Sequence, residues 1–131
     1  MNATVDGSNI GVDVDNSSTL EGQGLSADNC PAASIRARDA SNANVSNGTA
    51  TGAGGSALVA SNGSTINAES MDVTGSTVDG VHSFYGSTIN FRNGLADDIS
   101  VTSGSTVNAD GATGTLSQTA NSITANGIIY Q

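Results

Sequence analysis

The sequence Gly-Ser-Thr-Ile-Asn occupies residues 63–67 and returns unchanged at residues 86–90, and a near copy, Gly-Ser-Thr-Val-Asn, follows at residues 104–108. Each copy comes directly after five residues that begin with an aliphatic side chain. A motif that recurs at a regular distance indicates a repeat architecture. The same register extends toward both ends of the chain, in steps of 23, 23, 23, 18 and 24 residues. Its successive starts are Val12, Ile35, Leu58, Val81, Ile99 and Ile123.

Each repeat has the pattern of short strands. Alternate side chains of a strand point to opposite sides, so each aliphatic start and the residue two positions later, such as Leu58 and Ala60, are expected to point inward. Another inward aliphatic position recurs eight residues after each start, and a third strand is expected near Met71–Val73. Three strands and three turns in about 23 residues predict an all-β parallel β-helix (a β-solenoid) of about six rungs, each rung being one turn of the coil.

Composition is also compatible with a disordered linker, because Ser, Thr, Asn and Gly make up 64 of the 131 residues. Linkers do not keep aliphatic side chains in register over five steps, so the β-helix is favoured. A helical protein is disfavoured, since no window has a sustained apolar period of 3.6 residues and glycines are frequent. Only residues 116–121 are ambiguous in this respect.

The length predicts a single domain. Residues 12–115 are expected to form the rungs, residues 1–11 a partial first rung or an added start at the initial Met, and residues 116–131 a C-terminal tail. A solenoid has two open ends that need caps or partners. Because no cap is visible before residue 12, we expect a piece of a longer protein, an obligate oligomer, or both.

Charge and motifs exclude several classes of function. The net charge is −9, with twelve acidic residues and three arginines, which argues against binding to nucleic acid or to anionic membrane surfaces. No apolar run approaches the length of a membrane span, so no membrane insertion is expected. No motif for a cofactor, a metal or a catalytic nucleophile is present. The single cysteine, Cys30, is expected to be a small buried apolar residue.

Two columns of polar residues give specific expectations about stacking. A serine recurs six residues after each start on the inward side, where it is expected to bond backbone groups at the bend; the column is Ser18, Ser41, Ser64, Ser87 and Ser105. On the outward side, the register places Arg36 over Asp13 and Arg38 over Asp15. We therefore predict two ion pairs between neighbouring rungs.

The short repeat, residues 81–98, holds most of the unusual side chains. Aromatic rings beside carboxylates and planar polar groups are typical of carbohydrate contacts. The candidate glycan-binding residues are His82, Phe84, Tyr85, Arg92, Asn93, Asp97 and Asp98. The competing interpretation is packing: Phe91 falls at an inward position, and Phe84 points outward where a neighbouring chain could cover it. Adjacent carboxylates on a strand point apart, so Asp97 and Asp98 make a poor catalytic pair.

An outward column of threonines raises a further alternative, ice binding, because regular threonine ranks on flat solenoids suggest it. That interpretation requires Thr-x-Thr, whereas here the residue two positions later is Asn or Glu. It is therefore disfavoured, and a hydrogen-bonded edge is the simpler explanation. The column consists of Thr19, Asn42, Thr65, Thr88 and Thr106.

Residues 57–70 (ALVASNGSTINAES), residues 80–94 (GVHSFYGSTINFRNG) and the ending at residues 121–131 resemble the β-helical regions of bacteriophage tailspike and tail-fibre proteins. The resemblance covers roughly residues 35–131 and rests on a repeat style and a tail, without a catalytic motif. It implies a right-handed β-helix, a homotrimer, a location on the virion tail outside the cell, and binding of bacterial surface polysaccharide. No catalytic residue can be carried over, because no active-site motif of the family is matched.

The resulting hypothesis is a non-enzymatic C-terminal segment of a phage tailspike or tail fibre, which trimerises, stabilises the spike and takes part in host attachment. Two alternatives stay open: a polysaccharide depolymerase with sites between subunits, and a bacterial surface adhesin. In the trimer the C-terminal tail would lock the subunits together. The expected interface residues are Val59, Phe84, Ile128, Ile129 and Tyr130.

Overall fold

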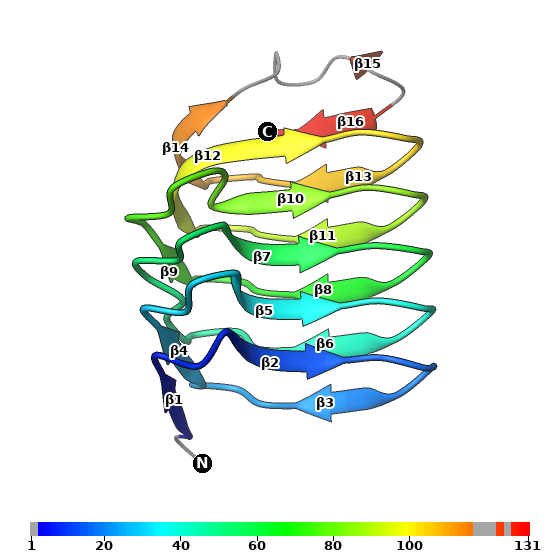
Figure 1. Ribbon diagram of the computed structural model, residues 1–131. Helices are drawn as coiled ribbons and strands as arrows, with labels where there is room; N and C mark the ends of the chain where they lie inside the picture. The colour runs from blue at the N-terminus through cyan, green and yellow to red at the C-terminus, as the bar shows by residue number, and fades with distance from the viewer. Residues whose placement is uncertain (1–2, 117–122, 125–126) are drawn as a thin grey trace.

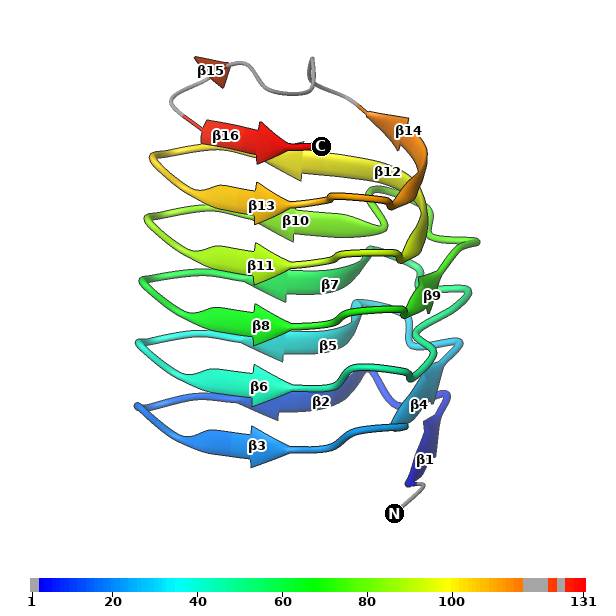
Figure 2. The ribbon, with the colours of Figure 1, turned by 180° about the vertical axis from the view of Figure 1, so that it is seen from behind.

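The computed structural model describes residues 3–116, 123–124 and 127–131, and these residues form strands and turns without a helix. Short parallel strands stack into a solenoid of about five turns with a repeat of about 23 residues, which confirms the predicted β-helix. In Figure 1 the front strands run to the right and the rear strands return to the left as the chain rises. The coil is therefore right-handed, and Figure 2 shows the same path from behind.

The solenoid has three faces. Face A consists of β2 (Ile10–Val14), β5 (Ala33–Ala37), β7 (Ser56–Ala60), β10 (Val81–Ser83), β12 (Leu95–Val101) and β14 (Thr113–Leu116). Face B consists of β3 (Thr19–Glu21), β6 (Asn42–Asn44), β8 (Thr65–Asn67), β11 (Thr88–Asn90), β13 (Thr106–Asn108), β15 (Ile123–Thr124) and β16 (Gly127–Tyr130). The narrow face C consists of β1 (Thr4–Asp6), β4 (Ser26–Asp28), a bridge at Thr49, β9 (Asp72–Val73) and the beginning of β12.

The predicted register is confirmed for the first five starts. They lie side by side along face A and pair in parallel, in the order Val12, Ile35, Leu58, Val81 and Ile99. The sixth start is wrong: Ile99 pairs with Leu116, and Ile123 pairs antiparallel with Ile128. The rung that follows Ile99 is short again, so face A receives its next strand before Ile123 is reached.

The short rung has a simple structural cause. In the rung before it, residues 74–80 form a loop that connects face C to face A. In the short rung Leu95 pairs with Asp72, and Ile99 pairs with Val81. Only Asp97 and Asp98 therefore replace the loop, within a continuous strand whose register shifts at this point. The shift is a β-bulge, a feature that re-aims side chains.

The core consists of the inward side chains of all three faces. Phe91 is fully buried as predicted, and so is Cys30. The inward column of face B is buried from Ala43 to Val107, whereas Leu20 at the N-terminal end is only partly covered. The strand expected near residues 71–73 is present as β9.

The corner between faces A and B repeats one turn geometry in successive rungs. In the third rung Asn62 and Gly63 have φ values of 53° and 72°, and the Ser64 N–H donates to the carbonyl of Ser61 at 3.3 Å. Two consecutive left-handed residues are characteristic of a type I′ turn. The inward serine column follows this corner and is described below.

The C-terminal tail is not separate from the rungs. Strand β16 pairs in parallel with β13, with Ile129 beside Val107 and Tyr130 beside Asn108, so it forms the last rung of face B. The remainder of the expected tail, residues 117–122 and 125–126, lies outside the described residues.

Candidate functional site

The outward side of face A carries two columns of side chains whose chemistry changes along the rod. The first column runs Asp13, Arg36, Val59, His82 and Ser100. The second column runs Asp15, Arg38, Ser61, Phe84 and Thr102. Both columns are charged in the N-terminal rungs and become aromatic in the fourth. This change marks the one place on face A, within the described residues, where rings gather.

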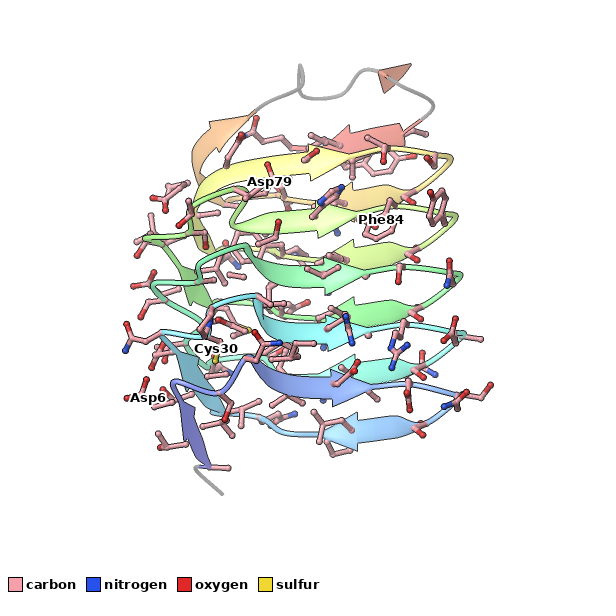
Figure 3. The ribbon with its side chains drawn as sticks, viewed as in Figure 1. Asp6, Cys30, Asp79 and Phe84 are labelled. Carbon is pink, nitrogen blue, oxygen red and sulfur yellow. The ribbon has the colours of Figure 1, made fainter. Side chains whose placement is uncertain are left out.

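The aromatic cluster consists of His82, Phe84 and Tyr85, which we call the aromatic platform. The ring centroids of His82 and Phe84 lie 4.9 Å apart, and those of Phe84 and Tyr85 lie 5.0 Å apart at 69°, an edge-to-face arrangement. Such spacings are favourable for aromatic pairs. The Tyr85 side chain is 62% exposed, while His82 and Phe84 are partly covered. Figure 3 places Phe84 on the front of the molecule, over face A.

Tyr85 occupies a backbone position that does not suit it. Its φ of 53° lies in the left-handed region, at the corner where the other rungs carry smaller polar residues: Asn16, Asp39, Asn62 and Ser103. Asn and Asp adopt this conformation more readily than a bulky aromatic residue does. The fold therefore holds an exposed tyrosine at some cost in conformational energy, as is common for residues at ligand-binding sites.

An acidic residue, Asp79, lies beside the aromatic platform and precedes it in the sequence. Asp79 is the second-last residue of the loop of residues 74–80, and its carboxylate lies 3.4 Å from Nδ1 of His82. The Asp79 side chain is only 13% exposed. Burial raises the pKa of Asp79, the charge of Asp98 raises it further, and His82 and a hydrogen bond from Ser56 lower it in part. Figure 3 shows Asp79 on the same side of the molecule as Phe84.

The predicted glycan-binding residues are not all brought together. His82, Phe84 and Tyr85 form the platform, and Asp98 acts on Asp79 beside it. Arg92 and Asn93 follow β11 at the corner between faces B and C, away from face A.

Asp97 at the bulge accepts a hydrogen bond from the Ser76 N–H at 3.0 Å, which ties it to the loop of the rung below. Sequence reasoning missed Asp79. Its position three residues before His82 was visible, but the loop conformation that brings the two together was not.

The predicted interface residues are also divided. Val59 and Phe84 lie on face A, whereas Ile128 and Tyr130 lie on face B, and Tyr130 is 50% exposed. Ile129 is fully buried in the core beside Val107, so its side chain does not face a partner, and this part of the prediction is wrong. Alternation along β16 explains the difference, because the neighbours of an outward residue on a strand point inward.

All three arginines of the chain are paired with carboxylates. Arg36 and Arg38 bond Asp13 and Asp15, as predicted, at 2.5 and 2.8 Å. Arg92 lies 3.9 Å from Glu69 and 3.7 Å from Asp110. Since the chain contains no lysine, no arginine or lysine side chain is left to give the platform a positive charge.

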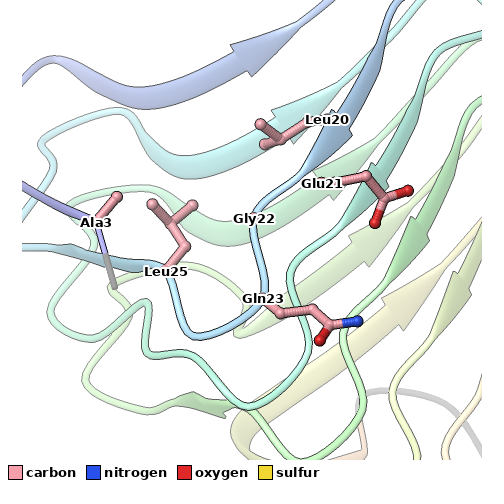
Figure 4. A pocket seen from close by; sticks show the side chains of 6 residues that line it. All are labelled: Ala3, Leu20, Glu21, Gly22, Gln23 and Leu25. Atoms are coloured by element: carbon pink, nitrogen blue, oxygen red, sulfur yellow. The ribbon is translucent and has the colours of Figure 1, made fainter. Parts of the chain in front are cut away.

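The open N-terminal end of the solenoid forms a second, apolar feature. A groove of about 410 Å³ lies there, and Figure 4 shows the side chains around it. The groove lies at the partly covered N-terminal end of the core, where β3 is the edge strand of face B. The lining residues are Ala3, Leu20, Glu21, Gly22, Gln23 and Leu25.

The described residues contain no group of three or more metal-ligating side chains that could hold an ion. Nor do they contain a helix with the length and hydropathy needed to cross a membrane. Comparisons of the chain with family models, with curated proteins and with solved structures give no match.

Proposed function

We propose that this chain is a rigid, non-enzymatic segment of a bacteriophage tailspike or tail fibre, which assembles as a homotrimer and takes part in attachment to a bacterial surface. The observation that carries the proposal is the distribution of apolar groups over a right-handed parallel solenoid. Ile128 and Tyr130 lie outward at the C-terminal end of face B, and the aromatic platform lies on face A. The strands of faces A and B lie on opposite sides of the coil (Figures 1 and 2).

In the proposed trimer, three copies of the Ile128–Tyr130 pair meet near the three-fold axis. The free energy falls when a partner covers outward aliphatic and aromatic side chains, so such burial stabilises the assembly. Face A, with Val59 and Phe84, then points away from the axis. This arrangement leaves the aromatic platform accessible to a ligand and gives the C-terminal strand the role of holding the subunits together.

The test is the absolute mass of the chain by light scattering on a sizing column. We expect about three times 12.8 kDa for the wild type. The double variant Ile128→Ser/Tyr130→Ser should dissociate, because it removes the apolar contact, while the matched face-A variant Val59→Ser should keep the trimeric mass. A monomeric wild type would contradict the assembly, and a trimer that survives the double variant would place the interface elsewhere.

A polysaccharide depolymerase is the second candidate, and one observation favours it. The pKa of Asp79 is raised by burial, and the negative charge of a second carboxylate, Asp98, raises it further. Glycoside hydrolysis uses a protonated carboxylic acid together with a carboxylate. Incubation with capsule or O-antigen separates the candidates: released oligosaccharide that disappears in Asp79→Asn supports the enzyme, and no release supports the structural segment.

A further inference from the structure

The aromatic platform has the form of a stacking surface for sugar rings, and this inference rests on the attachment role proposed above. A pyranose presents C–H groups on one face, and these pack against the electron-rich faces of aromatic rings. The edge-to-face contact of Phe84 and Tyr85 places two rings side by side at the end of β10. The two ring centroids lie 5.0 Å apart and the ring planes meet at 69°, so the pair offers two apolar ring faces at an angle to each other, against which a sugar ring can pack.

The strained conformation of Tyr85 supports a ligand-binding role. Asn62 occupies the corresponding corner one rung below with the same φ of 53°, so the turn does not require a tyrosine. Its ring is exposed and contacts Phe84, not the core. A conformational cost that is offset only by a surface contact with Phe84 is expected where a side chain is displayed for a partner.

Polar groups for sugar hydroxyls surround the rings. Nδ1 of His82 faces Asp79, which orients the imidazole, and Nε2 of His82 makes no hydrogen bond within the described residues. Ser100 and Thr102 follow in the next rung of the same two columns. An imidazole nitrogen and two hydroxyls can donate and accept, as hydroxyl recognition requires.

The electrostatics restrict the kind of sugar. The Asp79 carboxylate lies 3.4 Å from Nδ1 of His82, and Asp98 directly precedes Ile99, which pairs with Val81. The nearest arginines on face A, Arg36 and Arg38, lie two rungs away and are bonded to Asp13 and Asp15. An anionic sugar would therefore meet carboxylates with no free cation to balance its charge, at a total chain charge of −9. Uncompensated like charge is an effective means of rejecting a ligand.

We propose that the aromatic platform binds neutral sugar units of a bacterial surface polysaccharide and rejects uronic or sialic acid units. Phe84 and Tyr85 supply the stacking surface, and His82 is a hydroxyl-binding group held in place by Asp79. The pair Asp79 and Asp98 sets the discrimination against anions.

The experiment compares neutral and anionic polymers of matched sugars, galactan against polygalacturonate and mannan against polymannuronate, by titration of the full chain. We expect binding of at least one neutral polymer and no binding of its anionic counterpart. Phe84→Ala should weaken the neutral affinity at least about tenfold, since a lost stacking contact is worth roughly one decade. Tyr85→Asn should also weaken it, and misfolding cannot explain that loss because Asn suits the turn. Thr65→Ala, on face B, is the matched control and should leave affinity unchanged.

A charge variant tests the discrimination separately. In the wild type the Asp98 side chain accepts a hydrogen bond from the Ile99 N–H at 2.8 Å. Asp98→Asn keeps an oxygen that can accept this bond and removes one negative charge. The variant should retain neutral binding and gain measurable binding of the anionic polymer. Equal affinity of the wild type for both polymers, unchanged affinity in Phe84→Ala, or no binding of any polymer would each overturn the inference. The mass measured on the same samples keeps the two proposals apart: a trimer without glycan binding leaves the assembly intact and removes only the sugar site.

Discussion

The side-chain oxygen of Ser87 accepts a hydrogen bond from the backbone N–H of Ser64, one rung below, at 3.2 Å. The same bond joins Ser41 to Ser64 at 3.1 Å and Ser87 to Ser105 at 3.1 Å. These N–H groups lie at the corner before face B, and each donates to the serine hydroxyl of the next rung; the Ser64 N–H is shared with the carbonyl of Ser61. The inward serine column is therefore part of the hydrogen-bonding scheme of the solenoid, as its position in the sequence predicts.

Replacement of a column serine is expected to destabilise the protein by leaving a buried N–H unpaired. Ser64→Ala removes the acceptor of the Ser41 N–H, and such a loss costs about 1–3 kcal/mol. The free energy of unfolding in urea measures it. The neighbouring variant Thr65→Ala, at an exposed site, should change stability by less than about 0.5 kcal/mol. Equal losses in the two variants would show that the hydroxyl of Ser64 has no structural role.

The contact of Gly94 with Phe91 gives a packing prediction. A Cβ added at Gly94 would lie 2.4 Å from Cζ of the buried Phe91 ring, so Gly94→Ala should destabilise by about 1–3 kcal/mol through overpacking. The double variant Phe91→Leu/Gly94→Ala should be less destabilised than the sum of the two single variants, because the smaller side chain makes room. Thermal unfolding of the four proteins forms the cycle, and strict additivity would contradict the contact.

Tyr85→Asn is expected to stabilise the protein while it weakens ligand binding. Asn tolerates the left-handed backbone better than Tyr does, which is worth about 1–2 kcal/mol, and loss of the ring contact with Phe84 offsets part of this gain. Chemical denaturation of the wild type and the variant measures the difference. The control Asn62→Tyr introduces the same residue at the corresponding corner, where φ is also 53°, and should lose a similar amount. If Tyr85→Asn is no more stable than the wild type, the backbone of Tyr85 carries no strain.

The ion pair between Arg36 and Asp13 should make a small, salt-sensitive contribution. Both side chains are 29% exposed, and a double-mutant cycle with alanine should give a coupling free energy of about 0.2–1 kcal/mol. High salt should reduce this coupling. The hydrogen bond from Arg36 holds the pKa of Asp13 below its ordinary value, despite some burial. The coupling should therefore be present at neutral pH and disappear as acid protonates the carboxylate.

Asp79 should give a pH dependence of the opposite sign. Its pKa is raised in the folded protein, chiefly by burial, so the folded state binds a proton at pH values where the unfolded state has released it. Between the unfolded and the folded pKa, stability from this group falls as pH rises. Relative to the wild type, Asp79→Asn should therefore gain stability as pH rises above the ordinary aspartate pKa of about 4. Urea unfolding at several pH values checks this, and a difference that is constant with pH would contradict the raised pKa.

Much of the fold was predictable because each rung repeats the environment of its neighbours. The alternation of Leu58 and Ala60 determines which side chains point inward, and the parallel stacking carries that assignment to every rung. The pairs of Arg36 with Asp13 and of Arg38 with Asp15 follow from the same register. For such features, residues that are one repeat apart in the sequence are in contact in the structure.

The rest depended on segments that do not repeat. Ile123 matches the apolar pattern, but strand β14 takes the expected place on face A because the rung is shortened. The approach of Asp79 to His82 depends on the loop of residues 74–80, which has no counterpart in the next rung. Nearness in the sequence also does not place two residues on the same face. Arg92 lies only ten residues after His82, yet the chain turns a corner between them.

The connection from face C to face A keeps one length through three rungs, because Ser26, Thr49 and Asp72 align on face C while Ile35, Leu58 and Val81 align on face A. It then shortens to Asp97 and Asp98 in the next rung, where Leu95 aligns with Asp72 and Ile99 with Val81. The core register is the same on both sides of each connection. This edge of the rod is therefore a natural grafting point. We expect that a foreign peptide, or a lineage-specific insertion, can be accommodated at Gly75 without moving a single core side chain, so that new recognition surfaces can be added to an unchanged rod.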